Sequence, residues 1–219
     1  MWRNLIIVSL AACVAAGGAL GDPLDPKIHI TSADQAAAAA VILTSNDLGG
    51  GWNGGTIKAT ILKMPRCPAQ QPNFADLTLT GHAEANFNNG NGGWQIDSDV
   101  TVLKSAKQVT TQFARLMKPK LGICIKYDVL KSTGADPNVR LGLVKRLGFP
   151  KVAPVALLYR TSILYQVGKK TVTIYDDTLM LGKGRTSIWM NIVAPSTDQG
   201  PLELREQQIA KTLVARVRA

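Results

Sequence analysis

Four polar side chains lie in pairs at a spacing that suits acid–base chemistry. His82 and Glu84 are two residues apart, and so are Asp97 and Asp99. Residues two apart on a strand point to the same face, so either pair could place an acid beside a base. Two carboxylates about 5 to 10 Å apart across a cleft are the groups that glycoside hydrolysis requires. A hydrolase that uses these four residues is therefore one hypothesis.

The alternative is that these side chains form an exposed polar face, and the rest of the sequence favours it. Asp176 and Asp177 form a further acidic pair, which is typical of a solvated turn or strand edge. The chain contains no Gly-x-Ser-x-Gly, His-Glu-x-x-His or Gly-x-x-x-x-Gly-Lys-Ser/Thr motif. We therefore expect a protein that is not an enzyme, with no catalytic residues and no cofactor.

Metal ions and nucleic acids are also disfavoured as ligands. The two histidines, His29 and His82, and the cysteines lack the paired spacing of a zinc site. The formal net charge is +10, but the lysines and arginines are dispersed and form no run with interleaved aromatic residues. A basic surface of this kind is expected to attract anionic envelope polymers or lipid headgroups.

The first residues predict export. Arg3 provides the positive charge of a signal peptide's first region, and residues 5–16 form the apolar region that follows it. Ala19-Leu20-Gly21 resembles a cleavage site. We therefore expect residues 1–21 to be a signal peptide and the mature protein to be secreted or to lie in the cell envelope. The apolar run thins at Gly17 and has no positive residue directly after it, which disfavours a membrane-spanning helix.

Two features of the cysteines leave alternatives open. Leu10-Ala11-Ala12-Cys13 matches a lipobox, so lipidation at Cys13 would instead make the protein a membrane-anchored lipoprotein. Membrane association is expected only in that case. Cys67 and Cys124 remain after cleavage, and in an oxidising compartment they most simply form one disulfide. The competing interpretation is two separate buried thiols.

The elements begin with a helix and a strand pair. Ser32 and Gln35 have the spacing of a capping box, which predicts that a helix begins there. The glycine-rich stretch 46–55 is expected to be a structured turn that packs around the side chain of Trp52. Hydrophobic residues alternate with polar ones over 77–87 and again over 94–102, with a turn at 88–93 between them. An antiparallel pair is therefore expected.

The sequence after residue 102 predicts further helices and strands. A second capping box at Ser105 opens a helix that ends before Pro119. Strand-like runs follow a loop at 132–138, and the chain closes with a helix. The strands are expected at 155–167, 170–175 and 186–193, and the closing helix at 201–218. The order predicts an α+β protein with a linker at 22–31 and a single domain at 32–219.

One motif resembles a known family. Asp47-Leu48-Gly49-Gly50-Gly51-Trp52 is similar to the Asp-Leu-Pro-x-Gly-Trp turn of a group of exported bacterial envelope proteins, with Gly49 in the place of proline. The order of cysteines, strands and helices is also similar, including Tyr159-Arg160 and Gly184-Arg185 in strand positions. Such proteins resemble the extracellular sensor domain of the PknH-type receptor kinases.

The resemblance covers residues 32–218, and it implies both a fold and a function. It implies a curved antiparallel sheet flanked by helices on one side, with a cleft on the other. This chain carries no kinase domain, so any sensing output would need a separate partner.

A ligand-binding or sensor-like module is the leading hypothesis, with a small molecule, lipid or cell-wall fragment in the cleft. The aromatic residues that could line the cleft are Trp94, Tyr159, Tyr165, Tyr175 and Trp189. The other hypothesis is a structural protein that docks on an envelope protein or an anionic polymer.

Overall fold

The computed structural model describes residues 24–59, 67–90, 93–118, 120–133 and 136–218. The expected signal peptide at 1–21 and the candidate lipidation residue Cys13 lie outside the described residues. No helix in the described ranges has the length and apolar character needed to cross a membrane.

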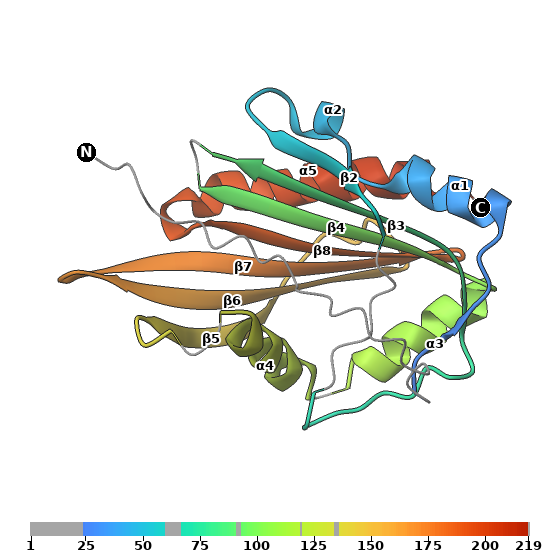
Figure 1. The fold of residues 1–219 in the computed structure, drawn as a ribbon, viewed down its shortest axis with the longest axis horizontal. Helices are drawn as coiled ribbons and strands as arrows, with labels where there is room; N and C mark the ends of the chain where they lie inside the picture. The colour runs from blue at the N-terminus through green and yellow to red at the C-terminus, as the bar shows by residue number, and fades with distance from the viewer. Residues whose placement is uncertain (1–23, 60–66, 91–92, 119, 134–135, 219) are drawn as a thin grey trace.

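One open sheet of eight strands forms the centre of the domain (Figure 1). Its order is β1-β3-β4-β8-β7-β6-β5, and β2 pairs with β3 beside this path. All pairs are antiparallel except the two-residue β1–β3 pair. The strands are β1 (Lys27–Ile28), β2 (Asn53–Ile57), β3 (Thr78–Asn89), β4 (Trp94–Leu103), β5 (Val139–Leu147), β6 (Val155–Val167), β7 (Lys170–Lys183) and β8 (Thr186–Pro195).

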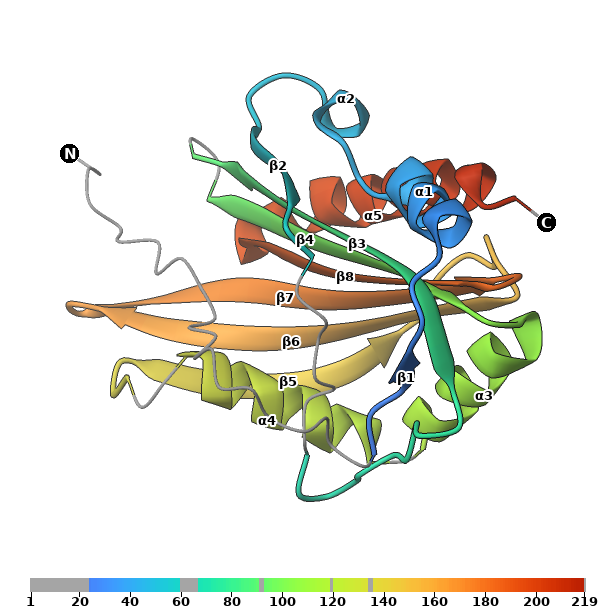
Figure 2. The same ribbon diagram turned by 45° about the vertical axis from the view of Figure 1, so that its right-hand side comes forward.

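Helices lie on both faces of the sheet, which differs from the expectation of helices on one side (Figure 2). We call the two sides the α5 face and the α4 face. The α5 face carries α1 and α5, and the α4 face carries α3 and α4. The helices are α1 (Ser32–Val41), α2 (Ser45–Leu48), α3 (Ala106–Leu116), α4 (Leu121–Thr133) and α5 (Gln199–Arg216), with a 3₁₀ turn at Ser196–Asp198.

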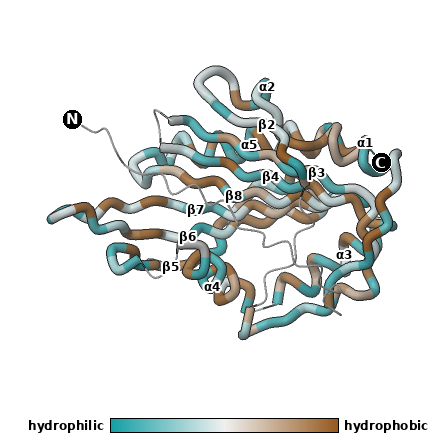
Figure 3. The backbone as a smooth tube through the Cα atoms, viewed as in Figure 1, coloured by the Kyte–Doolittle hydropathy of each residue, from teal (hydrophilic) through white to brown (hydrophobic). Residues whose placement is uncertain are grey.

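Strand alternation gives each face its own core, because neighbouring residues of a strand point to opposite faces. In β7, Leu179 and Leu181 join the core under α1 and α5, while Met180 between them joins the core under α3 and α4. Figure 3 shows apolar and polar residues along the strands of the sheet. The α+β class, the single domain and the disulfide are confirmed. The expectation of a wholly antiparallel sheet needs one correction, the parallel β1–β3 pair.

The capping residues differ in part from those expected. Ser105 caps α3 as predicted, accepting a hydrogen bond from the backbone N–H of Gln108. The cap of α1 is Thr31 and not Ser32, because the Thr31 hydroxyl accepts from the N–H of Asp34. Gln35 binds the backbone of His82 on β3, so its side chain positions the helix on the sheet.

The sequence did not predict α4 and β5, nor α2 and β2, which overlap the stretch 46–55 that was expected to be a turn. The residues expected to be a linker, 22–31, contribute β1 to the sheet. The strand expected at 170–175 runs on to Lys183. Each of these segments gains its structure from the sheet beside it, and its own periodicity was too weak to identify it.

The glycine-rich turn holds a buried aromatic contact, as the sequence predicted. Trp52 is half-buried against the α5-face core and meets Trp94 edge to face, with ring centroids 6.4 Å apart. The Asp47 carboxylate accepts from the backbone N–H of Thr44 at 2.8 Å and from Nη1 of Arg216 at 3.0 Å. The turn is therefore tied to the last turn of α5.

Cys67 and Cys124 form a disulfide with their Cα atoms 5.1 Å apart. This confirms the predicted bridge and excludes two separate thiols. The bond joins the segment that precedes β3 to α4, so it fixes α4 on its face of the sheet. Disulfides of this kind are typical of proteins outside the cytoplasm.

β5 forms one edge of the sheet. Its pairing with β6 is interrupted by a register shift between Leu141 and Val144. Arg140, Lys145 and Arg146 on this strand are exposed, and Leu143 at the shift is 66% exposed.

Candidate functional site

Six consecutive strands place a polar side chain at the same register position. The successive partners pair directly, from β3 through β4, β8, β7 and β6 to β5. Directly paired residues in antiparallel strands project from the same face. These side chains therefore form one line across the α4 face, which we call the polar row. Its members are Asn86, Asp97, Asn191, Thr178, Tyr159 and Arg146.

Hydrogen bonds fix part of the polar row and leave part of it available. Asn86 donates to Oδ1 of Asp97, and Gln95 donates to its Oδ2 at 3.0 Å. Thr178 donates from its hydroxyl to Oδ1 of Asn191 at 3.2 Å. Within the described ranges, the amide nitrogen of Asn191 makes no hydrogen bond. The row therefore offers an oriented donor beside a fixed carboxylate.

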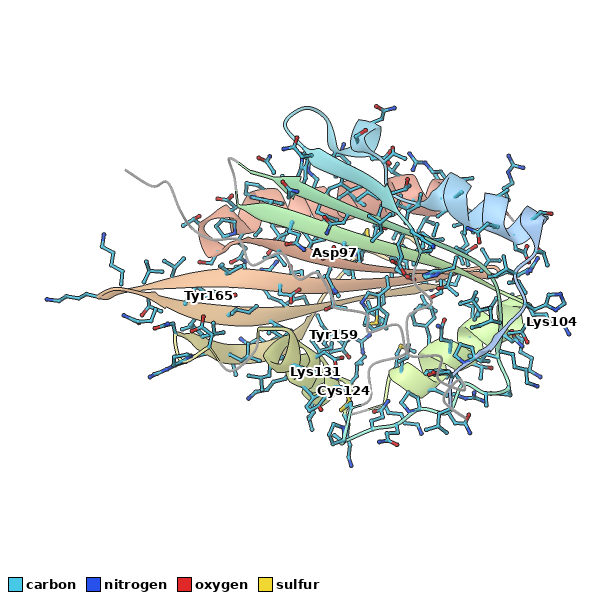
Figure 4. All side chains as sticks on the ribbon, in the orientation of Figure 1. Asp97, Lys104, Cys124, Lys131, Tyr159 and Tyr165 are labelled. Atoms are coloured by element: carbon cyan, nitrogen blue, oxygen red, sulfur yellow. A yellow bond between two sulfur atoms is a disulfide. The ribbon has the colours of Figure 1, made fainter. Side chains whose placement is uncertain are left out.

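The polar row is accessible from solvent at several points. Asn86, Asp97, Asn191 and Tyr159 are half-buried, and Arg146 at the end of the row is exposed. Figure 4 shows Asp97 on β4 and Tyr159 on β6, with α4 and Cys124 below them. Two described helices pack on this face, α3 against the central strands β4, β7 and β8 and α4 against β5 and β6.

Asp176 lies next to the row on β7 and titrates near neutral pH. Burial, together with the negative charges of Asp177 and Asp97, raises the pKa of Asp176 to about 7. Its Oδ1 is buried and has no hydrogen-bond partner among the described residues. At neutral pH this carboxyl group is therefore present in both protonation states, so it can donate or accept a hydrogen bond.

His82 and its acidic neighbours form a second cluster on the same face. Its Nε2 is hydrogen-bonded to Asp99 and lies 3.4 Å from Oε1 of Glu84. Burial by itself lowers the pKa of His82, but the Asp99 hydrogen bond and the two negative charges outweigh it and raise the pKa above its usual value. The cluster is thus a histidine held between two carboxylates that favour its protonated form.

The same three residues could be considered as metal ligands, since their donor atoms lie within 4.8 Å of one another. A metal-bound histidine almost always donates its second ring N–H to an acceptor. Nδ1 of His82 is buried and has no partner among the described residues. This second nitrogen fits a metal site poorly, and an ion triad describes the cluster better.

The His82 triad predicts a pH-dependent contribution to stability. Because the folded-state pKa is raised, the stabilisation is fully present below the unfolded pKa of about 6.5 and is lost as pH rises through the folded value. We expect the Tm difference between the wild type and His82→Gln to be larger at pH 6 than at pH 8.5. Thermal unfolding of both proteins over this range measures it. A difference that is constant with pH would contradict the assignment.

The five aromatic residues expected to share a cleft are divided between the faces. Tyr159, Tyr165 and Trp189 pack against the α4-face core. Trp94 and Tyr175 pack on the α5 face. Trp94 donates from Nε1 to Asp198 at 2.8 Å, and Tyr175 lies under the Arg160 guanidinium at 4.5 Å from the ring centroid. Tyr159 belongs to the polar row and Trp189 lies close to Asn191 on β8, whereas Tyr165 pairs with Val172 near the end of β6 and lies apart from them. The structure therefore does not gather the five residues into one cleft.

Comparison with known proteins gives a structural likeness but no family. No protein-family model matches the chain, and no curated protein matches it. Among solved structures, LpqN of Mycobacterium tuberculosis, which is involved in cell envelope biogenesis, is similar over 74% of this chain and 77% of its own. The identity is 9% and the TM-score is 0.32.

Proposed function

We propose that this protein is an exported binding module that holds a hydroxyl-rich ligand, such as a cell-wall glycan fragment, along the polar row. The observation that supports the proposal is the row itself, with amide, carboxylate and hydroxyl groups at one register of the sheet. Sugars are bound by such groups through paired hydrogen bonds. Trp189 and Tyr159 offer the apolar ring surfaces that ligand sites combine with a few polar groups.

The compartment supports this class of ligand. The disulfide and the export signal expected at residues 1–21 both favour a place outside the cytoplasm, where wall polymers are found. Release after cleavage is the proposed route, and lipidation at Cys13 is the alternative. In either case the folded domain would meet the same polymers.

The proposed module binds without catalysis. The His82 imidazole is paired with Asp99 and Glu84, so its proton is held in the triad. Asp97 accepts hydrogen bonds on both oxygens, from Asn86 and Gln95. A carboxylate held in this way is suited to orient a ligand hydroxyl.

A variant at the centre of the polar row tests the proposal. Asn191→Ala removes the available amide donor and should weaken binding of soluble wall glycan fragments about fivefold, since a ligand hydrogen bond contributes roughly 1 kcal/mol. Isothermal titration calorimetry on the intact protein measures the affinity. Asn138→Ala, an exposed asparagine before β5, is the matched control and should bind as the wild type does.

Two outcomes would count against the polar row. Equal affinity of Asn191→Ala and the wild type would remove the row from the binding site. Retention on anionic polymers that is lost in salt and insensitive to row variants would favour the other hypothesis, a protein that docks through its basic surface.

A further inference from the structure

A cavity of about 240 Å³ opens on the α5 face, between α5 and the segment that joins β5 to β6. It lies on the opposite side of the sheet from the polar row, so it is independent of the proposed function. Apolar side chains from the β5–β6 side form one half of its wall, and polar side chains of α5, two of them acidic, form the other half. The lining residues are Leu147, Gly148, Phe149, Leu158, Glu203, Glu206 and Gln207.

Glu206 is the unusual member of this lining. It is only 1% exposed, and neither carboxyl oxygen has a hydrogen-bond partner of ordinary geometry among the described residues. A buried polar group without a partner costs about 1 to 3 kcal/mol, and a charged one costs more. The lining therefore contains a buried carboxyl group whose neighbour among the described residues is the carboxyl group of Asp177, with no cation bonded to either of its own oxygens.

Arg160 is the cation that faces Glu206, and it is already bound to another carboxylate. Arg160 is committed to Asp177, donating from Nε at 2.9 Å and from Nη2 at 2.6 Å. Nη1 of Arg160 lies 3.5 Å from Glu203, whose side chain is 46% exposed. One guanidinium thus faces three carboxyl groups.

We propose that this cavity binds a short alkylammonium ion, with the ammonium group between Glu206 and Glu203 and the alkyl chain against the apolar wall. The ammonium donates to the carboxyl oxygens and supplies the positive charge that an ionised Glu206 requires. Leu147, Phe149 and Leu158 suit a hydrocarbon chain, and the Phe149 ring can also face a cation. A hard metal ion fits less well, because Ca²⁺ needs six to eight oxygen ligands and the side chains of the lining that carry oxygen are those of Glu203, Glu206 and Gln207.

Binding should release a proton. Burial, followed by the neighbouring Asp177 carboxylate, raises the pKa of Glu206 to about 10, and Arg160 only partly offsets this. Glu206 is therefore protonated at neutral pH without a ligand. When the ammonium ion binds, the Glu206 carboxyl loses its proton to the buffer and becomes the carboxylate partner of the cation. The affinity should accordingly increase with pH between 6 and 9.

The test is calorimetric titration of the intact protein with butylammonium at pH 7, in buffers that differ in ionisation enthalpy. We expect saturable binding and release of about one proton per ligand, since Glu206 changes from protonated to ionised. Glu206→Gln keeps the shape but cannot ionise, so it should lower the affinity at least about tenfold and abolish the proton release. Asp136→Asn, an exposed loop acid, is the control and should leave both unchanged.

Several results would overturn the proposal. Absence of saturable butylammonium binding to the wild type would do so directly. Equal affinity for butanol and butylammonium would indicate an apolar cavity without charge recognition. Unchanged affinity and proton release in Glu206→Gln would place any binding elsewhere. Circular dichroism of this variant confirms that it is folded, so a loss of binding can be assigned to the carboxyl group.

Discussion

Arg160→Met should lower the free energy of unfolding by about 3 to 5 kcal/mol, the usual cost of breaking a buried ion pair. Arg160 is the described partner that neutralises Asp177, whose side chain is fully buried. Without the guanidinium, Asp177 is left as an uncompensated charge beside Glu206. The Arg160 contact with the Tyr175 ring is lost as well. Urea denaturation at pH 7 measures the change.

A double variant separates the charge from the packing. Arg160→Met combined with Asp177→Leu removes both charges, and it should recover most of the stability lost by the single variant. Arg140→Met on β5 removes an exposed arginine and should change stability by less than about 0.5 kcal/mol. A single variant as stable as the wild type would show that the pair contributes nothing net.

Loss of the disulfide is expected to have a comparable effect. Cys67 and Cys124 are 57 residues apart in sequence, and opening a loop of this size costs about 4 kcal/mol in the chain-entropy model. The double variant Cys67→Ala/Cys124→Ala should show this loss by urea denaturation. Both cysteines are buried, so alanine leaves small cavities that add to the cost.

Reducing agent provides the control for the disulfide. It should destabilise the wild type to a similar degree and leave the double variant unaffected. If reduction changes the unfolding midpoint of both proteins equally, the effect does not come from this bond. We expect α4 to lose protection from hydrogen exchange first, since the bond joins it to the segment before β3.

The strand pair of β3 and β4 and the helix α3 were predictable because their local patterns are strong. Ile96, Val100 and Val102 alternate with polar residues, and Ser105 provides a cap. α4 was missed although Leu121, Ile125 and Val129 repeat every four residues and pack into one core. The polar residues between them give a weak contrast, and the sheet contact that decides the helix is not local.

The sites were less predictable than the elements. The polar row depends on register across six strands, and no single segment of sequence contains that information. Asn191 and Thr178 become neighbours only when β7 and β8 pair. Glu206 did leave a signal, because it precedes Ile209 and Leu213 on the buried stripe of the closing helix. A glutamate at such a position indicates either a partner or a function.

The register shift in β5 has a consequence for how the protein behaves in a crowded compartment. A flat edge strand presents free N–H and C=O groups that can pair with another chain. β5 interrupts its ladder between Leu141 and Val144 and surrounds the break with Arg140, Lys145 and Arg146. A second copy approaching edge to edge would meet a kinked backbone and like charges. The shift thus protects the open sheet from growing into a fibre.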